Sequence, residues 1–276
     1  MIISVSRRCD IPRFRLDWFM ERLDAGFVDV VNPFNAAQTR RVSLLPDDAE
    51  VFVFWTRDPR PVLVCAEKLE KAGRRFYVMV TVTGYPSILE PNVPPAETIC
   101  AAMNKLAQII GKQRVIWRYD PVFISSITNS NFHQNNFSAL AQRLHGSVGR
   151  VIVSLYDGYK SARQRVNSLE QNDILKMTHN EDINALLGTI SETARTAGME
   201  IQSCAADDTV AASGIKAGAC IDAELIRDVW GIEAGGRDKN QRPRCRCAKS
   251  VDIGRYNDCA AGCVYCYARS SPPGQR

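Results

Sequence analysis

Short runs of β-branched and aromatic residues recur along the chain and alternate with longer segments of helical periodicity. Eight runs are expected to form strands, at residues 2–6, 28–32, 51–55, 76–83, 115–119, 151–156, 199–203 and 250–253. Apolar residues at three- and four-residue steps predict helices, among them residues 15–25, 61–71, 95–110, 136–144 and 182–197. This alternation is typical of parallel strands joined by crossover helices, so we expect an α/β protein.

Polar residues, glycines and prolines gather where the predicted strands end. RRCDIP follows the first strand, TRDP the third and DPV the fifth. A (β/α) barrel places its active site at this edge, and a doubly wound open sheet also binds ligands there. We expect a single domain over residues 1–276, a full or partial (β/α) barrel of the TIM type, in which residues 204–276 form a cysteine-rich C-terminal segment.

The composition narrows the class of protein. With 45% hydrophobic and 24% charged residues, the chain is neither disordered nor fibrous. The N-terminal apolar run is too short for a signal peptide, and no apolar stretch approaches the roughly 20 residues that span a bilayer. We therefore expect a cytoplasmic protein with no membrane partner. The net charge of +5 is compatible with nucleic-acid binding, but a solvated basic surface is the more ordinary interpretation.

Ten cysteines in a reducing compartment are more typical of metal binding or reactivity than of disulfides. Cys259, Cys263 and Cys266 lie in the segment YNDCAAGCVYCYAR with the spacing C-x3-C-x2-C. Four thiolates close every iron of a four-iron cluster, whereas three leave one iron with a free position. The three histidines lie far from this segment in sequence, which disfavours a mixed Cys/His zinc finger.

This spacing, with Tyr265 just before the last cysteine, resembles the signature of the radical S-adenosylmethionine (radical SAM) enzymes. The resemblance implies a barrel of the radical SAM type that carries its cluster loop at the C-terminus. It also implies that the three cysteines ligate a [4Fe-4S] cluster whose open iron binds SAM, with Tyr265 near the adenine. Reductive cleavage of SAM would generate a 5′-deoxyadenosyl radical, and the electron would come from a reductase or a flavodoxin- or ferredoxin-type donor.

Two further resemblances concern the flanking residues and the whole chain. The cluster segment is similar to that of the spore photoproduct lyase branch. The stretches SVSRRCDIP, NPFN, FWTRDP, VIWRYDP, GACID and DIGRYNDC resemble the uncharacterised domain-of-unknown-function family 1848. Neither resemblance names a reaction, because residues around a cluster report the cofactor rather than the substrate. A nucleic acid, a small molecule and a peptide all remain open as the substrate.

The cluster loop follows the last predicted strand, whereas in most radical SAM enzymes it follows the first. Because the first and last strands of a barrel can be neighbours, a circularly permuted order keeps the loop in the same place. The Gly-Gly-Glu element usual in the superfamily is missing. By position, Ser6, Arg7, Arg8 and Asp10 are candidates to contact SAM, since arginine pairs with a carboxylate and Asp10 could accept from an ammonium or a ribose. The alternative is a surface turn closed by an Arg-Asp pair.

Arg118 and Asp120 are predicted to lie at the mouth of the sheet as catalytic residues, together with Asp10, because charged residues at a barrel strand's C-terminal end are often functional. The alternative is an ion pair that holds a loop. The Arg-rich stretch at residues 231–249 has little apolar content and is expected to be a long loop. The cluster site could be covered by this loop, by a partner or by nothing.

Four more cysteines lie in the last third of the chain, namely Cys204, Cys220, Cys245 and Cys247. They could close a second iron-sulfur cluster or a zinc site, or they could be ordinary buried thiols, since their spacing is irregular. A rival hypothesis takes Cys245 or Cys247 as a fourth ligand for the three-cysteine loop. The chain would then be a non-catalytic iron-sulfur or zinc protein that binds nucleic acid.

Overall fold

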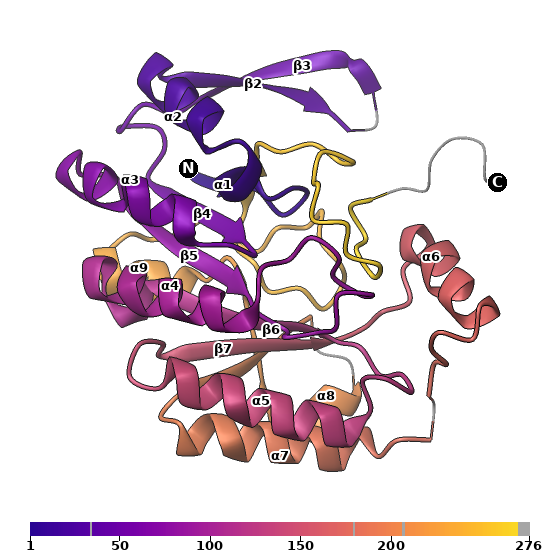
Figure 1. Ribbon diagram of the computed structural model, residues 1–276. Coiled ribbons are helices and arrows are strands. Elements are labelled where there is room, and N and C mark those ends of the chain that lie inside the picture. The colour runs from indigo at the N-terminus through magenta and orange to yellow at the C-terminus, as the bar shows by residue number, and fades with distance from the viewer. Residues whose placement is uncertain (34, 179, 206–207, 270–276) are drawn as a thin grey trace.

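The computed structural model, which describes residues 1–33, 35–178, 180–205 and 208–269, has one large parallel sheet (Figure 1). The strand order is β10-β1-β4-β5-β6-β7-β8-β9, and every neighbouring pair is parallel. The strands are Ile2–Val5 (β1), Val51–Thr56 (β4), Phe76–Thr81 (β5), Val115–Val122 (β6), Arg150–Leu155 (β7), Glu200–Cys204 (β8), Lys216–Gly218 (β9) and Ser250–Asp252 (β10). The predicted α/β class is confirmed.

Both faces of the sheet are buried. All residues of β1, β4 and β5 are buried, which explains their continuous β-branched and aromatic runs. Alternate side chains contribute to two separate cores: Phe52 and Phe54 pack under the helical layer, whereas Val53 and Trp55 face the opposite side. Phe19, from the helical layer, packs edge-on against Phe52 and Phe54, with ring centroids 5.9 and 5.3 Å apart.

The helices alternate with the strands as the sequence predicted, with several additions. They are Ile11–Phe14 (α1), Leu16–Ala25 (α2), Arg60–Lys71 (α3), Ala96–Ile110 (α4), Ser130–Leu144 (α5), Lys160–Gln171 (α6), Ile183–Thr196 (α7), Asp208–Ala212 (α8) and Ala223–Trp230 (α9), with a 3-10 turn at Lys112–Arg114 (η1). Helix α5 begins six residues before its predicted start, because Asn129 caps it by accepting from the Phe132 amide. Helices α1, α6, α8 and α9 were not predicted.

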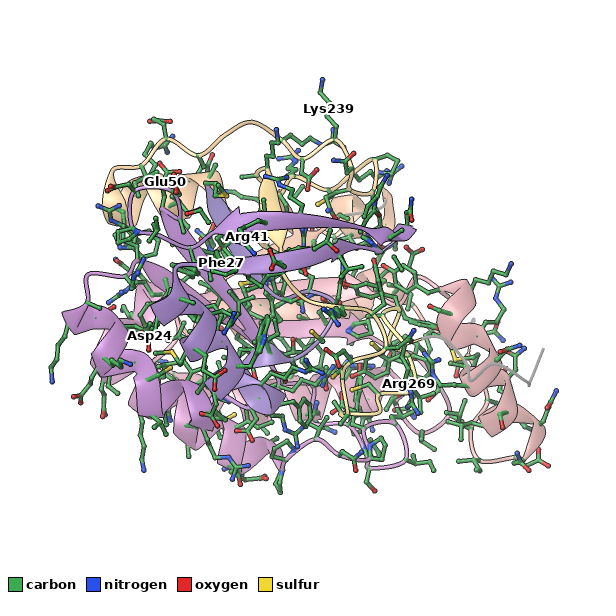
Figure 2. All side chains as sticks on the ribbon, turned by 90° about the horizontal axis from the view of Figure 1, so that it is seen from above. Asp24, Phe27, Arg41, Glu50, Lys239 and Arg269 are labelled. Atoms are coloured by element: carbon green, nitrogen blue, oxygen red, sulfur yellow. The ribbon has the colours of Figure 1, made fainter. Side chains whose placement is uncertain are left out.

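The predicted strand at residues 28–32 is present, but it does not belong to the main sheet. Phe27–Asn32 (β2) pairs instead with Asn35–Ser43 (β3) in a separate antiparallel hairpin. Strand β3 is mostly exposed, so it lacks the apolar alternation that reveals a half-buried strand. On the hairpin, the Arg41 guanidinium lies 3.9 Å from the centre of the Phe27 ring, and both residues are labelled in Figure 2. The eighth strand of the main sheet is the unpredicted β9.

The first and last strands are neighbours, as the permuted order requires. Strand β10 pairs with β1 through Ile2–Ser250, Ile3–Val251 and Ser4–Asp252. The ends of the sheet are β10 and β9, and the ladders of the described residues do not join these two strands, so a full barrel is not shown. The predicted cysteine-rich segment 204–276 includes residues 206–207 and 270–276, which lie outside the described part.

The second face of the sheet is covered by α9 and by the predicted loop at residues 231–249. Leu225 and Ile226 of α9 pack with Cys245, Cys247 and Ala248 against this face. The loop contains no helix or strand and is tied back by a bridge between Arg237 and Ala248. Within the described part of the chain, no helix combines the length and apolar character that crossing a bilayer requires.

Candidate functional site

A cavity of about 420 Å³ opens at the C-terminal edge of the parallel sheet. Because parallel strands all end at the same edge, residues far apart in sequence meet here. Both groups of cysteines line the cavity, together with Ser6, Arg7, Arg8, Asp10, Arg118, Asp120 and Tyr265. The structure thus brings together every site residue that the sequence predicted. Asn240, Gln241 and Arg242 also line it, so the Arg-rich loop forms part of the cavity wall.

The cluster loop, residues 256–269, follows β10 and is tied to the loop after β5. The amide of Val264 donates to the carbonyl of Leu89 at 2.9 Å, and the side chain of Asn92 donates to the carbonyl of Ala260 at 2.9 Å. Arg15 forms a 2.6 Å ion pair with Asp258. The loop therefore has fixed contacts outside its own segment.

Helix α6 supplies a further anchor that the sequence analysis missed. Arg165 donates to the carbonyls of Val264, Cys266 and Arg269 at 2.9, 2.5 and 2.9 Å. One guanidinium thus bridges three backbone acceptors of the cluster loop, a task suited to its rigid fork of donors. No spacing in the sequence marks Arg165, because its partners lie about 100 residues away.

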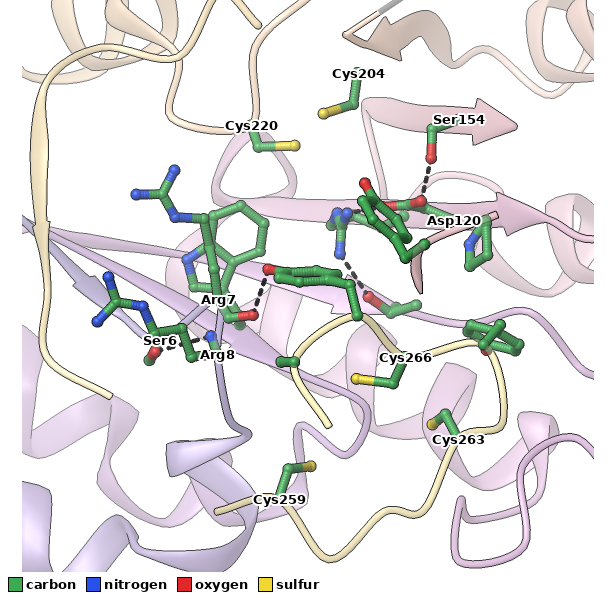
Figure 3. A pocket seen from close by; sticks show the side chains of 18 of the residues that line it. Ser6, Arg7, Arg8, Asp120, Ser154, Cys204, Cys220, Cys259, Cys263 and Cys266 are labelled. Atoms are coloured by element: carbon green, nitrogen blue, oxygen red, sulfur yellow. Dashed lines mark hydrogen bonds and ion pairs between the residues drawn. The ribbon is translucent and has the colours of Figure 1, made fainter. Parts of the chain in front are cut away.

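The sulfur atoms of Cys259, Cys263 and Cys266 point toward a common space at the cavity (Figure 3). Burial raises the pKa of Cys259, and it raises the pKa of Cys263 to about 12 despite the nearby Arg57 guanidinium. Such thiols hold their protons until a metal displaces them. Three soft donors on one anchored loop, facing one cavity, fit an iron-sulfur cluster with an open iron.

Tyr265 is held at its hydroxyl by a buried ion pair. Arg57 donates to this hydroxyl at 2.6 Å and to the Glu90 carboxylate at 2.7 Å, and the hydroxyl in turn donates to Glu90. Thr83 donates to the same carboxylate oxygen. The tyrosine that the resemblance places near an adenine thus lines the cavity with its ring while its hydroxyl is engaged by Arg57 and Glu90. The sequence analysis singled out neither Arg57 nor Glu90 for this role.

The seam between β1 and β10 is organised by the buried carboxylate of Asp252. It accepts from the hydroxyls of Ser4 and Ser6 and from the amides of Arg7 and Gly254, the latter two at 2.8 and 3.0 Å. The Ser6 hydroxyl is therefore occupied by protein partners. The guanidinium of Arg7 lies 3.6 Å from Asp252.

Asp10 has a structural task as well as a place in the cavity wall. Its carboxylate caps α1 by accepting from the Arg13 amide at 3.0 Å and also accepts from the Arg57 amide at 2.8 Å. Burial raises the pKa of this carboxyl to about 6. The predicted self-contained Arg-Asp turn is not formed by Arg7 or Arg8 with Asp10. Arg7 forms an ion pair with Asp252 instead, and the Arg8 guanidinium lies over the Tyr256 ring, 5.1 Å from its centre.

Arg118 and Asp120 form the ion pair that the sequence allowed, and both face the cavity. Ser154 donates to Asp120 (Figure 3). Arg118 donates to Thr81 at 3.1 Å. The guanidinium also lies 5.1 Å from the centre of the Trp55 ring. Its Nε is buried and has no hydrogen-bond partner among the described residues. Residues of β4, β5 and β7 thus orient the ion pair of Arg118 and Asp120.

The second group of cysteines comes from three segments, at the end of β8, after β9 and in the Arg-rich loop. Cys220 hydrogen-bonds with both Cys204 and Cys247, and Cys245 hydrogen-bonds with Cys247. Because Cys220 and Cys245 stabilise its thiolate, the pKa of Cys247 is lowered. Among the described residues, no three His, Cys, Asp or Glu side chains surround a single point as ligands of one metal ion would.

Comparison with protein families places the chain in a family without a known activity. The model of the family described as Domain of unknown function (DUF1848) matches residues 2–268. Because this match covers nearly the whole chain, the protein belongs to that family, as the sequence resemblance predicted. No curated protein matches the chain significantly.

Proposed function

We propose that this DUF1848 protein is a radical SAM enzyme of unknown substrate, built on a partial (β/α) barrel. The observation that carries the proposal is the position of Cys259, Cys263 and Cys266: all three lie on one anchored loop at the C-terminal edge of the sheet and line one cavity. These residues would hold a [4Fe-4S] cluster with one open iron. When bound, the cluster supplies the electron that cleaves SAM reductively to methionine and a 5′-deoxyadenosyl radical.

The end of β1 is the proposed place for the methionine part of SAM. It lies beside β10, whose C-terminal end leads into the cluster loop, and in the absence of a Gly-Gly-Glu element Arg7 and Arg8 are the charged candidates at this strand end that line the cavity. Arginine can pair with a carboxylate through two parallel hydrogen bonds. Asp252 fixes the backbone at Arg7, which would keep such a contact in place.

Arg118 and Asp120 are the proposed substrate-facing residues. Thr81, Ser154 and Trp55 orient the pair, and both of its residues line the cavity. A positioned arginine and carboxylate can together bind a polar group of the substrate. We expect a cytoplasmic enzyme that receives its electron from a reductase, a flavodoxin or a ferredoxin.

The rival hypothesis, a closed zinc or iron-sulfur module in a nucleic-acid-binding protein, needs a fourth ligand near the cluster loop. The two residues considered for it, Cys245 and Cys247, hydrogen-bond with each other, and Cys247 also bonds with Cys220. This contact pattern assigns them to the second group of cysteines. It therefore favours the open cluster over the closed module.

The test is reductive cleavage of SAM by protein reconstituted with iron and sulfide under nitrogen. After addition of dithionite and SAM, the expected product is 5′-deoxyadenosine, detected by chromatography. Cys263→Ala should abolish it, whereas Cys65→Ala, which changes a buried thiol in α3, should not. A wild-type protein that binds a cluster but neither binds nor cleaves SAM would contradict the proposal.

A further inference from the structure

The second group of cysteines forms a continuous set of thiols on the wall of the same cavity. Cys204 ends β8, Cys220 follows β9, and Cys245 and Cys247 lie in the Arg-rich loop. Their hydrogen bonds run from Cys204 to Cys220, on to Cys247 and then to Cys245. In Figure 3 the sulfur atoms of Cys204 and Cys220 point toward one another. Three separate segments thus deliver four sulfur atoms to one place.

Ordinary core packing does not account for this arrangement. Cys65 shows the usual behaviour of a buried thiol: it belongs to the hydrophobic core and donates to the carbonyl of Val62, in its own helix, at 3.4 Å. A thiol of this kind behaves as a small hydrophobic side chain. The four cysteines of the second group instead take one another as partners. Such mutual contact is expected where thiols share a soft metal centre.

The surroundings of the second group favour negative charge on sulfur. The amide of Ile221 donates to the sulfur of Cys247 at 3.4 Å, and the Arg242 guanidinium lies 3.9 Å from the sulfur of Cys204. Arg118 and Arg7 add positive charge nearby, opposite Cys204 and Cys247 respectively. Thiolates bound to metal carry negative charge, and hydrogen bonds to their sulfur atoms are a normal part of such sites. These groups would stabilise negative charge on the sulfur atoms of Cys204 and Cys247.

We infer that Cys204, Cys220, Cys245 and Cys247 hold a second iron-sulfur cluster, closed by four thiolates, on the cavity wall. The spacing of Cys245 and Cys247 favours a cluster over a single zinc ion, because the one residue between them is fewer than the roughly two to four residues that separate paired zinc ligands.

This inference stands on the second group of cysteines alone and does not depend on the proposed function. The substrate cavity would then have a closed cluster on the wall formed by β8, β9 and the Arg-rich loop, in addition to the open cluster of the C-terminal loop. A closed cluster has no free position for a ligand, so its chemistry would be limited to holding this wall together and to accepting or donating an electron.

The test begins with a variant that lacks the first site, Cys259→Ala, Cys263→Ala and Cys266→Ala together. Reconstituted under nitrogen, this variant should bind about four iron and four sulfide per chain, and the unmodified protein should bind about eight of each where the proposed open cluster also forms. Its Mössbauer spectrum should show the signal of a four-iron cluster. Adding Cys220→Ala or Cys247→Ser should reduce the iron to near zero, whereas adding Cys100→Ala, a buried thiol in α4, should not.

Two outcomes would overturn the inference. One is a triple variant that folds, as judged by circular dichroism, but binds no iron, and the other is a variant that binds zinc alone under the same conditions. Where Cys220→Ala fails to fold, the iron content of the folded Cys247→Ser variant decides. The formation of 5′-deoxyadenosine by the unmodified protein is measured separately, so failure of the second cluster and failure of the proposed function give different results.

Discussion

Arg165 offers the sharpest test of how the cluster loop is held. We consider the substitution Arg165→Lys, which keeps the positive charge and most of the stem but replaces five donors in a rigid fork with one ammonium group. Arg165 donates three hydrogen bonds to loop carbonyls, at 2.9, 2.5 and 2.9 Å. A lysine at this position should satisfy only one of the three acceptors. The loop should therefore open more easily without unfolding of the sheet and its helices.

The size of the effect follows from the number of bonds lost. A hydrogen bond with a charged donor contributes about 1.5–3 kcal/mol, and the half-buried position of Arg165 favours the lower end. Losing two bonds should therefore lower the free energy of local opening by about 3 kcal/mol. Because about 1.4 kcal/mol corresponds to a tenfold change in an equilibrium constant, opening should become roughly 100-fold more frequent.

Amide hydrogen exchange of the metal-free protein measures this opening directly. The reporters are the amides of Val264 and Asn257, which are hydrogen-bonded to Leu89 and Ala268 in the closed loop. Their exchange should accelerate in Arg165→Lys, and the free energy of global unfolding should fall by about the same 3 kcal/mol, because the lost bonds belong to the folded state. The exposed neighbour Arg163, which donates to the Gly158 carbonyl at 3.4 Å, gives the matched control Arg163→Lys. Unchanged exchange at Val264 in Arg165→Lys would refute the reasoning.

Two further predictions concern buried groups outside the cluster loop. Burial lowers the pKa of His133 to about 4, so between about pH 4 and 6.5 the unfolded chain binds more protons than the folded protein. As the pH falls through this window, His133 alone should therefore lower the free energy of unfolding by about 3 kcal/mol. His133→Gln should remove this slope from urea titrations measured at successive pH values. Glu90→Gln should lower the free energy of unfolding by about 3–5 kcal/mol, because it leaves the buried Arg57 without its charged partner.

Matched controls separate these effects from general damage. His145→Gln changes an exposed histidine and should leave the pH slope of stability as it is in the unmodified protein. Glu67→Gln breaks an exposed ion pair with Lys71 within α3 and should leave the urea midpoint unchanged. A His133→Gln protein with the original slope, or a Glu90→Gln protein with unaltered stability, would contradict the corresponding prediction.

The positions of the main elements were readable from sequence wherever burial imposes a pattern. Strands β4 and β5 are buried on both faces, so only β-branched and aromatic residues fit them, and their runs were visible. Strand β3 is almost wholly exposed and therefore carries no such pattern. Strand β9 has only three residues, Lys216–Gly218, too few to show a period. Both strands are recognisable only through their pairing partners.

The same distinction applies to the site. The spacing of Cys259, Cys263 and Cys266 is local, and the parallel sheet requires that residues at successive strand ends gather at one edge, so the sequence predicted both the three-cysteine loop and its neighbours. It could not predict that Arg165 holds the loop or that Arg57 and Glu90 hold Tyr265, because these contacts join segments about 100 residues or more apart.

Sequence by itself determined the α/β class, the edge of the sheet where the site lies and the residues of the candidate open cluster. Only the tertiary structure decided that Cys204, Cys220, Cys245 and Cys247 belong together, since their irregular spacing left them without a common assignment. The physical reason is the range of the interactions. Periodic burial and the spacing of ligands within one loop involve residues that are close in sequence, so a sequence pattern reveals them. Contacts between distant segments form only after the strands have placed those segments side by side.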